Sequence, residues 1–341
     1  MSDDPVTSTA LPQALLDRLD PEYRAFVETQ PAALRIPLHT LDWSPAFRGV
    51  PGVPPPDLGQ APPVPVGATR TIELYDGRFS VRVLTPDGEG PKEGWPVLLF
   101  THGGGWVMGS VETGSAFYTR ACVEAKCVVV SVDYRLAPEN PFPAAIDDCF
   151  DTLRWISEGS LGKSTAITYI NKLIKIRYSG GTLAAIITQR ASRHGIPLVL
   201  QIIFTPLTNA TFSAKNRADW PPSMQEYEHV FALRALDMLW LRDLYLPNPA
   251  DRSLPDASPL LQDDPKVYQA MPPAFVGAME LDVLRSEAEM YAEKMRSHGV
   301  PVTVKVYKGA THLTVAADRV CQLARNIRDD KIAALKMAFV K

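Results

Sequence analysis

The sequence predicts an α/β protein with a mostly parallel sheet. From about residue 66 onward, runs rich in β-branched residues alternate with segments of helical periodicity. Two of the runs, Val128–Val132 and Val199–Phe204, are apolar almost throughout, as expected when helices cover both faces of a parallel strand. With 341 residues and 46% hydrophobic content, the chain is long enough for one large domain or two ordinary ones.

The first 65 residues differ in composition from the rest. Leu11–Leu19 and Glu22–Glu28 have helical spacing of apolar residues. Of the 31 prolines, 13 fall within the first 65 residues, eight of them between Pro45 and Pro65. Proline lacks the N–H that helices and inner strands need. We therefore predict a helical arm and a Pro-rich strap over residues 1–65, and one body over residues 66–341.

Strands and helices of the body can be placed in order. Thr69–Leu74 and Phe79–Leu84 are predicted to form a hairpin, because Asp-Gly lies between them. Further strands are predicted at Pro96–Phe100, Val128–Val132, Val199–Phe204, Ala274–Met279 and Val302–Tyr307. Helices are predicted at Gly114–Glu124, Ala144–Ile156, Glu287–His298 and Val315–Ile327.

Charge and composition exclude several functions. The 35 Lys and Arg residues against 38 Asp and Glu residues provide no positive excess for a nucleic-acid partner. No apolar run approaches the 18 residues of a membrane span, and the acidic start lacks a secretory signal, so we expect a cytoplasmic protein. We interpret the four cysteines as buried thiols, because they form no CxxC pair: Cys122, Cys127, Cys149 and Cys321. No clustered ligands predict a metal, and no cofactor is implied.

The most informative motif is His102–Trp106, His-Gly-Gly-Gly-Trp, which directly follows a predicted buried strand. Three consecutive glycines can adopt positive φ and aim neighbouring N–H groups at one point. Such a turn suits the stabilisation of a developing oxyanion.

This motif belongs to a larger pattern that spans roughly residues 66 to 320. The pattern resembles the hormone-sensitive-lipase-like branch of the α/β-hydrolases. The matching segments are His102–Trp106, Asp133–Glu139, Pro143–Asp148, Gly180–Ala185, Ala257–Leu260, Glu280–Leu284 and Gly309–His312. The resemblance implies an α/β-hydrolase fold with an eight-stranded, mostly parallel sheet. It also implies a helical cap built from the amino-terminal arm and an insertion at about residues 209–246.

The resemblance further implies a serine carboxylic-ester hydrolase that acts on small apolar esters. The chain order in this family is Ser, acid, His. Asp282 then matches the acid and His312 the base, and both follow predicted strands. The oxyanion-hole glycines are Gly103, Gly104, Gly105 and Gly180.

The nucleophile segment departs from the family pattern. The usual Gly-x-Ser-x-Gly elbow is replaced by Arg177-Tyr178-Ser179-Gly180-Gly181. An ungapped match puts Tyr178 at the nucleophile, whereas one deletion puts Ser179 there. We favour Ser179, because a phenol is a poor acyl-transfer nucleophile. Lys172, Lys175 and Arg177 would also charge a strand that should be central and buried.

Two other functions compete with ester hydrolysis. The disrupted elbow favours a weak or inactive member that binds a small molecule, as related plant hormone receptors do, although those receptors have lost the triad histidine and this chain retains His312. Gly162–Thr165 resembles part of a phosphate-binding loop, but residue 157, where the first glycine of that loop belongs, is Ser157. We therefore reject a nucleotide site.

Overall fold

The fold is described from a computed structural model of the chain. It describes residues 9, 11–49, 56–165, 169–178 and 181–339, with the backbone alone for residues 34, 165 and 169–178. Two predicted site residues, Ser179 and Gly180, lie outside the described residues.

One sheet of eight strands organises the described residues, in the order β1-β2-β4-β3-β5-β6-β7-β8. β1 pairs with β2 and β2 with β4 in antiparallel fashion, and every other pairing is parallel. The strands are β1 (Ala68–Leu74), β2 (Phe79–Thr85), β3 (Trp95–Thr101), β4 (Val128–Asp133), β5 (Tyr169–Tyr178), β6 (Leu198–Phe204), β7 (Ala274–Leu281) and β8 (Val302–Thr311). The prediction of a mostly parallel eight-stranded sheet is confirmed.

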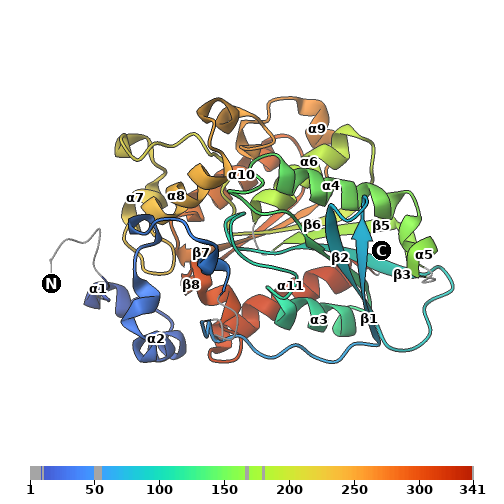
Figure 1. Cartoon of the computed structure of the whole chain (residues 1–341), viewed down its shortest axis with the longest axis horizontal. Coiled ribbons are helices and arrows are strands. Elements are labelled where there is room, and N and C mark those ends of the chain that lie inside the picture. Colours follow the sequence, from blue (N-terminus) through green and yellow to red (C-terminus); the bar gives the residue numbers. More distant parts are fainter. Residues whose placement is uncertain (1–8, 10, 50–55, 166–168, 179–180, 340–341) are drawn as a thin grey trace.

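Helices cover both faces of this sheet (Figure 1). One face carries α4 (Ala144–Ser157), α6 (Gly181–Arg193) and α10 (Arg285–Ser297); the other carries α3 (Ser115–Glu124) and α11 (Gln322–Phe339). Strand β3 shows the consequence: Leu99 joins the core cluster on the first face, whereas Leu98 and Phe100 join the one on the second. Alternate side chains of a strand point to opposite faces, so an entirely apolar strand feeds two cores.

The amino-terminal arm packs against a second group of short elements. Figure 1 shows α1 (Gln13–Leu16) and α2 (Pro21–Thr29) beside β8, and α7 (Pro222–Glu226) and α8 (Ala235–Tyr245) beyond the end of the sheet. The arm reaches α8 through His39, whose backbone N–H and ring Nδ1 lie 3.0 and 2.6 Å from Asp237 Oδ1. The arm and the predicted cap insertion are therefore joined by a buried polar contact.

The remaining short elements connect these layers. They are α5 (Ser160–Thr165), α9 (Pro265–Gln269) and the 3-10 turns η1 (Ala32–Arg35), η2 (Leu38–Thr40), η3 (Pro45–Arg48), η4 (Arg217–Asp219), η5 (Pro249–Ser253), η6 (Pro259–Leu261) and η7 (His312–Ala316). The Gly162–Thr165 sequence thus lies in α5.

The hairpin forms as the sequence predicts, whereas the last helix starts later than predicted. The Asp-Gly hairpin is confirmed, with φ of 58° at Asp76 and 81° at Gly77. The helix predicted to start at Val315 is wrong at its start, because that residue lies in η7 and α11 begins at Gln322. A capping box between Thr311 and Thr314 begins η7, which ends at Ala316, and residues 317–321 separate it from α11. All four cysteines are buried and free, as predicted.

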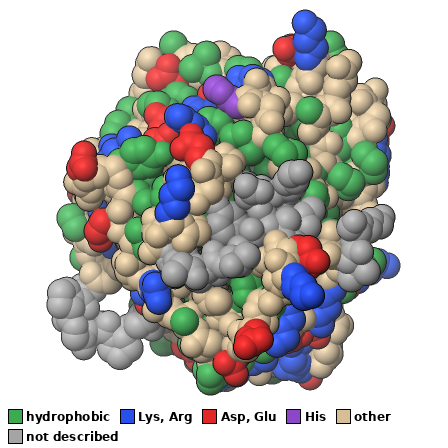
Figure 2. All heavy atoms as spheres, turned by 90° about the vertical axis from the view of Figure 1, so that its right-hand side faces the viewer, with side chains coloured by type: hydrophobic (Ala, Val, Ile, Leu, Met, Phe, Trp, Pro, Cys, Tyr) green, Lys and Arg blue, Asp and Glu red, His purple; other side chains and the backbone are tan. Residues whose placement is uncertain are grey.

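The surface carries both signs of charge. On the face shown in Figure 2, basic and acidic side chains are interspersed among apolar ones. This pattern agrees with the formal net charge of −3. Within the described part of the chain, no helix is long and apolar enough to cross a bilayer.

Candidate active site

Two of the predicted site residues meet at the carboxyl edge of the sheet. Asp282 follows β7 and His312 follows β8. The register of these parallel strands pairs Leu281 with Thr311, so the next residue of each strand emerges beside the other. His312 Nδ1 lies 2.9 Å from Asp282 Oδ2. Ligands of open α/β sheets bind at this same edge.

The pair is asymmetric in its exposure. Asp282 is 1% exposed, and its other oxygen, Oδ1, accepts a hydrogen bond from the Leu284 N–H at 3.1 Å. The His312 side chain is 24% exposed and lines a cavity. With Nδ1–H directed at the carboxylate, Nε2 is the nitrogen left to accept a proton. A buried carboxylate thus orients an accessible imidazole.

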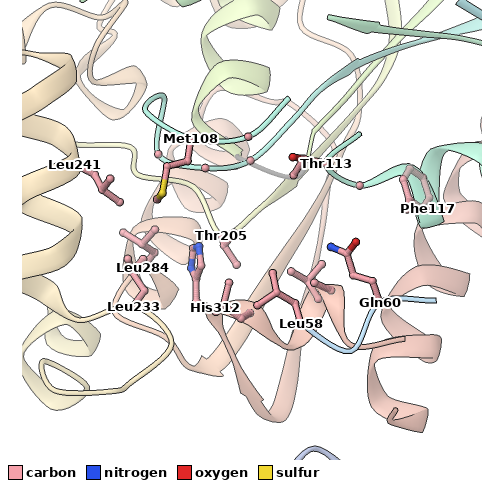
Figure 3. Close-up of a pocket in the computed structure, with 18 of the residues that line it drawn as sticks. Leu58, Gln60, Met108, Thr113, Phe117, Thr205, Leu233, Leu241, Leu284 and His312 are labelled. Atoms are coloured by element: carbon pink, nitrogen blue, oxygen red, sulfur yellow. The ribbon is translucent and has the colours of Figure 1, made fainter. Parts of the chain in front are cut away.

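The cavity is large enough for a small organic substrate. Its volume is about 480 Å³, within the usual range for ligand pockets. Figure 3 shows His312 near its middle, with Leu233 and Leu241 toward one end and Gln60 and Phe117 toward the other. Most of the lining is apolar. Leu233 and Leu241 come from the predicted cap segment, so that segment does line the pocket.

The glycine loop forms another part of the cavity wall. Gly103, Gly104 and Gly105 all line the cavity, with φ of 122° at Gly104 and 60° at Gly105. The Gly104 carbonyl accepts hydrogen bonds from the N–H groups of Val107 and Met108, at 3.2 and 2.9 Å. The N–H groups of Gly104 and Gly105 donate to no residue that the structure describes.

The loop has no room for side chains. A Cβ on Gly104 would lie 2.1 Å from the Met108 carbonyl oxygen, and one on Gly105 would lie 2.8 Å from Leu241 Cδ1. Trp106, which follows the glycines, is also held in place. Its carbonyl accepts a hydrogen bond from the Ala137 N–H at 2.9 Å, and its indole ring stacks on the Tyr245 ring with the centroids 4.7 Å apart. Gly104 is therefore required both by its positive φ and by space, whereas at Gly105 the positive φ is the main requirement.

His102 supports this loop from behind. It is completely buried, and burial lowers the pKa of its imidazole to about 4. Its Nδ1 lies 2.8 Å from the Gly103 carbonyl oxygen, which accepts the hydrogen bond, and its ring stacks on Tyr134 at 4.1 Å. The Tyr134 hydroxyl donates to the His102 carbonyl at 2.9 Å. A neutral, enclosed imidazole shapes the loop and does not exchange protons with a substrate.

The nucleophile segment lies between two well-placed elements. β5 ends at Tyr178 and is flanked by β3 and β6, so it is a central strand, and α6 begins at Gly181. Ser179 and Gly180 lie between these bounds, outside the described residues. The choice between Ser179 and Tyr178 therefore stays a prediction. In the described residues, no group of three or more His, Cys, Asp or Glu could hold a metal.

Several known proteins are similar to this chain. A model of the alpha/beta hydrolase fold matches residues 98–316. An AB hydrolase superfamily protein of Schizosaccharomyces pombe is 36% identical over 98% of each chain. Esterase LipI of Mycobacterium tuberculosis is 32% identical over 77% of this chain and 79% of its own length. A solved esterase of Pyrobaculum calidifontis is 32% identical, with a TM-score of 0.72 over 81% of this chain and 87% of that one.

The chain belongs to the α/β-hydrolase family. The predicted fold class and the resemblance to lipase-like esterases are thereby confirmed. The names of the relatives also agree with the predicted enzyme class, a carboxylesterase-like serine hydrolase.

A second buried carboxyl group, that of Glu287, lies close enough to Asp282 to be affected by its charge. Glu287 of α10 is completely buried, and its Oε2 accepts from the N–H groups of Thr208 and Asn209 at 2.6 and 2.8 Å. Its Oε1 has no hydrogen-bond partner among the residues that the structure describes. Burial raises the pKa of Glu287 to about 8, and the negative charge of Asp282 adds to this effect. The Glu287 carboxyl therefore binds a proton up to a higher pH than an exposed glutamate does.

Glu287 makes the stability of the hydrolase depend on pH. Its pKa is higher in the folded chain, at about 8, than the ordinary value of 4.5. Between these values the folded state holds a proton that the unfolded state has released, so a rise in pH lowers the free energy of unfolding. The slope approaches about 1.4 kcal/mol per pH unit for one proton. We expect Glu287→Gln to flatten this dependence in urea unfolding between pH 5 and 8.

Glu289→Gln, on the exposed side of the same helix, is the matched control and is expected to keep the wild-type slope. Equal slopes for wild type and Glu287→Gln would contradict the assignment.

Substitution of Gly104 tests whether the glycine loop contributes to catalysis. Gly104→Ala is expected to lower kcat/KM for an ester by about 100-fold or more, because its Cβ would meet the Met108 carbonyl and displace an oxyanion donor. Gly195→Ala is the control: Gly195 also has a positive φ, of 66°, but nothing lies within 4 Å of the position that its Cβ would take. Steady-state kinetics and thermal melting of both variants test this. Similar activity losses in the two would refute a local role for Gly104.

Proposed function

We propose that this hydrolase cleaves carboxylic esters by serine acyl transfer. The observation that carries the proposal is the Asp282–His312 pair, held at 2.9 Å, beside a cavity whose wall includes the glycine loop. This combination supplies an oriented base and oxyanion donors around one space. The esterase names of the relatives support the same activity.

The first half of the proposed reaction forms an acyl-enzyme. His312 Nε2 takes the proton of the Ser179 hydroxyl as its oxygen attacks the ester carbonyl. Asp282 stabilises the imidazolium that results, and the N–H groups of Gly104, Gly105 and Gly180 hold the oxyanion, with Gly103 shaping the turn. His312 then gives the proton to the leaving alcohol. The C–O bond of the ester breaks and an acyl-Ser179 remains.

The second half regenerates the enzyme. Water enters, His312 takes one of its protons, and the oxygen attacks the acyl carbon. The same donors hold the second oxyanion. Collapse breaks the bond to Ser179, which recovers its proton from His312, and the carboxylic acid leaves.

The lining of the cavity favours a small ester with an apolar part. Leu233, Met238, Leu241 and Leu284 provide aliphatic surface near the cap. Burying apolar substrate surface there contributes about 25 cal/mol per Å². The volume of about 480 Å³ suits a short or medium ester rather than a long-chain lipid.

The non-catalytic alternative is not favoured. A receptor-like binder needs no base, yet the imidazole of His312 is oriented by a buried carboxylate and directed into the cavity. The relatives include proteins named as an esterase, a carboxylesterase, a carboxylic ester hydrolase and an ethyl acetate hydrolase.

Hydrolysis of short p-nitrophenyl esters tests the proposal directly. We expect the purified protein to release p-nitrophenolate from the acetate and butyrate esters with saturation kinetics. If a sample that melts cooperatively hydrolyses these esters no faster than buffer alone does, the proposal is overturned. The non-catalytic binder of a small molecule would then be favoured.

A further inference from the structure

Strand β8 departs from its regular pairing with β7 near its carboxyl end. The regular parallel pairing runs as far as Tyr307, which lies opposite Met279. It resumes at Thr311, which lies opposite Leu281. Between these two pairs β7 has one residue, Glu280, whereas β8 has three. The extra residues form a bulge, and a bulge beside an active site re-aims the side chains that follow it.

This bulge decides which residue of the neighbouring strand end the imidazole meets. In the register of the regular pairs, His312 would lie opposite Leu284, two positions beyond Asp282. The two extra residues of β8 shift the register, so that His312 emerges opposite Asp282 instead. The 2.9 Å contact between His312 Nδ1 and Asp282 Oδ2 therefore depends on the shape of the bulge.

The backbone of Gly309, in the middle of the bulge, is held by contacts from outside the strand ladder. Gly309 is buried and has a φ of 72°. Its N–H donates to Glu280 Oε2 at 2.8 Å, and its carbonyl accepts from the Asp20 N–H of the amino-terminal arm at 3.0 Å. Buried backbone groups that leave a ladder need such partners. The Glu280 side chain and the arm thus hold the bulge together.

The arm fits closely against this part of β8. A Cβ on Gly309 would lie 2.7 Å from the Asp20 nitrogen, so a side chain has no room there. Tyr23 of α2 is 3% exposed, and its hydroxyl accepts a hydrogen bond from Thr311 Oγ1 at 3.3 Å. The beginning of α2 therefore contacts both the bulge and the residue that directly precedes His312.

We propose that Glu280 is a positioning residue of the hydrolase: together with the arm, it holds the bulge that keeps His312 beside Asp282. Glu280 is not among the residues that line the cavity, so it acts on the reaction through His312 and not through the substrate. The inference rests on the proposed esterase function and deepens it by naming a residue that aligns the base.

Removal of the Glu280 carboxylate tests this by separating kcat from KM. For p-nitrophenyl butyrate, we expect Glu280→Ala to lower kcat about 100-fold and to leave KM within about twofold, because both halves of the reaction use His312 and a misplacement of about 1 Å is enough for such a loss. Glu280→Gln retains an oxygen that can accept the Gly309 N–H, and we expect its kcat to stay within about fivefold of wild type. If Glu280→Ala melts early, Glu280→Met, which fills similar space without an acceptor, replaces it.

Glu226→Ala is the matched control, because Glu226 shares an ion-pair partner with Glu280. Arg18 of the arm lies 3.3 Å from Glu226 Oε1 through Nη1 and 3.4 Å from Glu280 Oε1 through Nη2. The Glu226 side chain is 47% exposed, and exposed ion pairs contribute little to stability. We expect Glu226→Ala to keep the wild-type kcat. A loss as large as that in Glu280→Ala would assign the effect to the ion pairs of Arg18 and overturn the proposal.

Crystal structures of wild type, Glu280→Ala and Glu280→Gln separate this inference from the esterase function. We expect His312 Nδ1 and Asp282 Oδ2 to lie beyond about 3.5 Å in Glu280→Ala, where their hydrogen bond is lost, and within hydrogen-bond distance in the other two proteins. This measurement needs no turnover, so it decides the inference even if no ester is hydrolysed. An unchanged pair in Glu280→Ala, or a Glu280→Ala enzyme with wild-type kcat, overturns the positioning role and leaves the esterase function intact.

Discussion

His312→Ala is expected to lower kcat/KM for p-nitrophenyl butyrate by about 10⁶-fold, the scale seen when a catalytic histidine of a serine hydrolase is removed. The imidazole is the only base that the proposed mechanism uses, and it lies 2.9 Å from the acid that orients it. Asp282→Asn is expected to cost about 10⁴-fold, because an amide no longer stabilises the imidazolium or its correct tautomer. Stopped assays with long incubation are needed to measure such residual rates.

A matched histidine provides the control. His298 follows α10, and its ring stacks on Tyr268 at 4.1 Å, away from the residues that line the cavity. His298→Ala is expected to keep wild-type kcat/KM within about twofold, although its melting temperature should fall. A His312→Ala variant that retains more than a few per cent of activity would show that another group serves as the base.

Ser179→Ala is expected to abolish ester hydrolysis, whereas Tyr178→Phe should retain most of it. A serine hydroxyl activated by histidine forms a labile acyl ester, whereas a neutral phenol has no comparable role in this family. The strand that precedes Ser179 is central, between β3 and β6, as the elbow of a hydrolase requires. Kinetics of both variants, measured with the same ester, distinguish the two alignments.

Covalent labelling identifies the nucleophile independently of turnover. A fluorophosphonate reacts with an activated serine: the oxygen bonds to phosphorus and fluoride leaves. Peptide mass spectrometry should locate the label on Ser179 in wild type and find none after His312→Ala. A label on Tyr178, or persistent activity in Ser179→Ala, would reverse our choice of alignment.

Much of the fold follows from patterns that are local in the sequence. The apolar runs of β3, β4 and β6 predict buried parallel strands, because a strand covered on both faces cannot alternate polar residues. The Asp-Gly turn likewise predicts its hairpin. The start of α11 is not predicted correctly because apolar spacing continues across the separate turn η7. In the structure η7 ends at Ala316, and residues 317–321 separate it from α11.

Some residues of the candidate site are predictable from the sequence, whereas others are revealed only by the structure. His102–Trp106, Asp282 and His312 each lie in a recognisable motif, so sequence patterns alone can nominate them. No such pattern reveals the supporting roles of His102 and Glu287 or the cavity position of Lys331. Their signal is burial: a lone histidine, glutamate or lysine in a sequence looks like any solvated residue, and only packing shows otherwise.

The order of residues along the chain specifies the available chemistry: an α/β body, a glycine loop, and an acid and a base in a fixed order. The arrangement of these parts comes from tertiary contacts. The register of β7 against β8 brings together two residues 30 positions apart. α11, the strap and α3 together place a lysine at one end of a cavity whose other end is aliphatic. Such distances and burial depend on contacts between segments remote in sequence, which no local pattern of residues encodes.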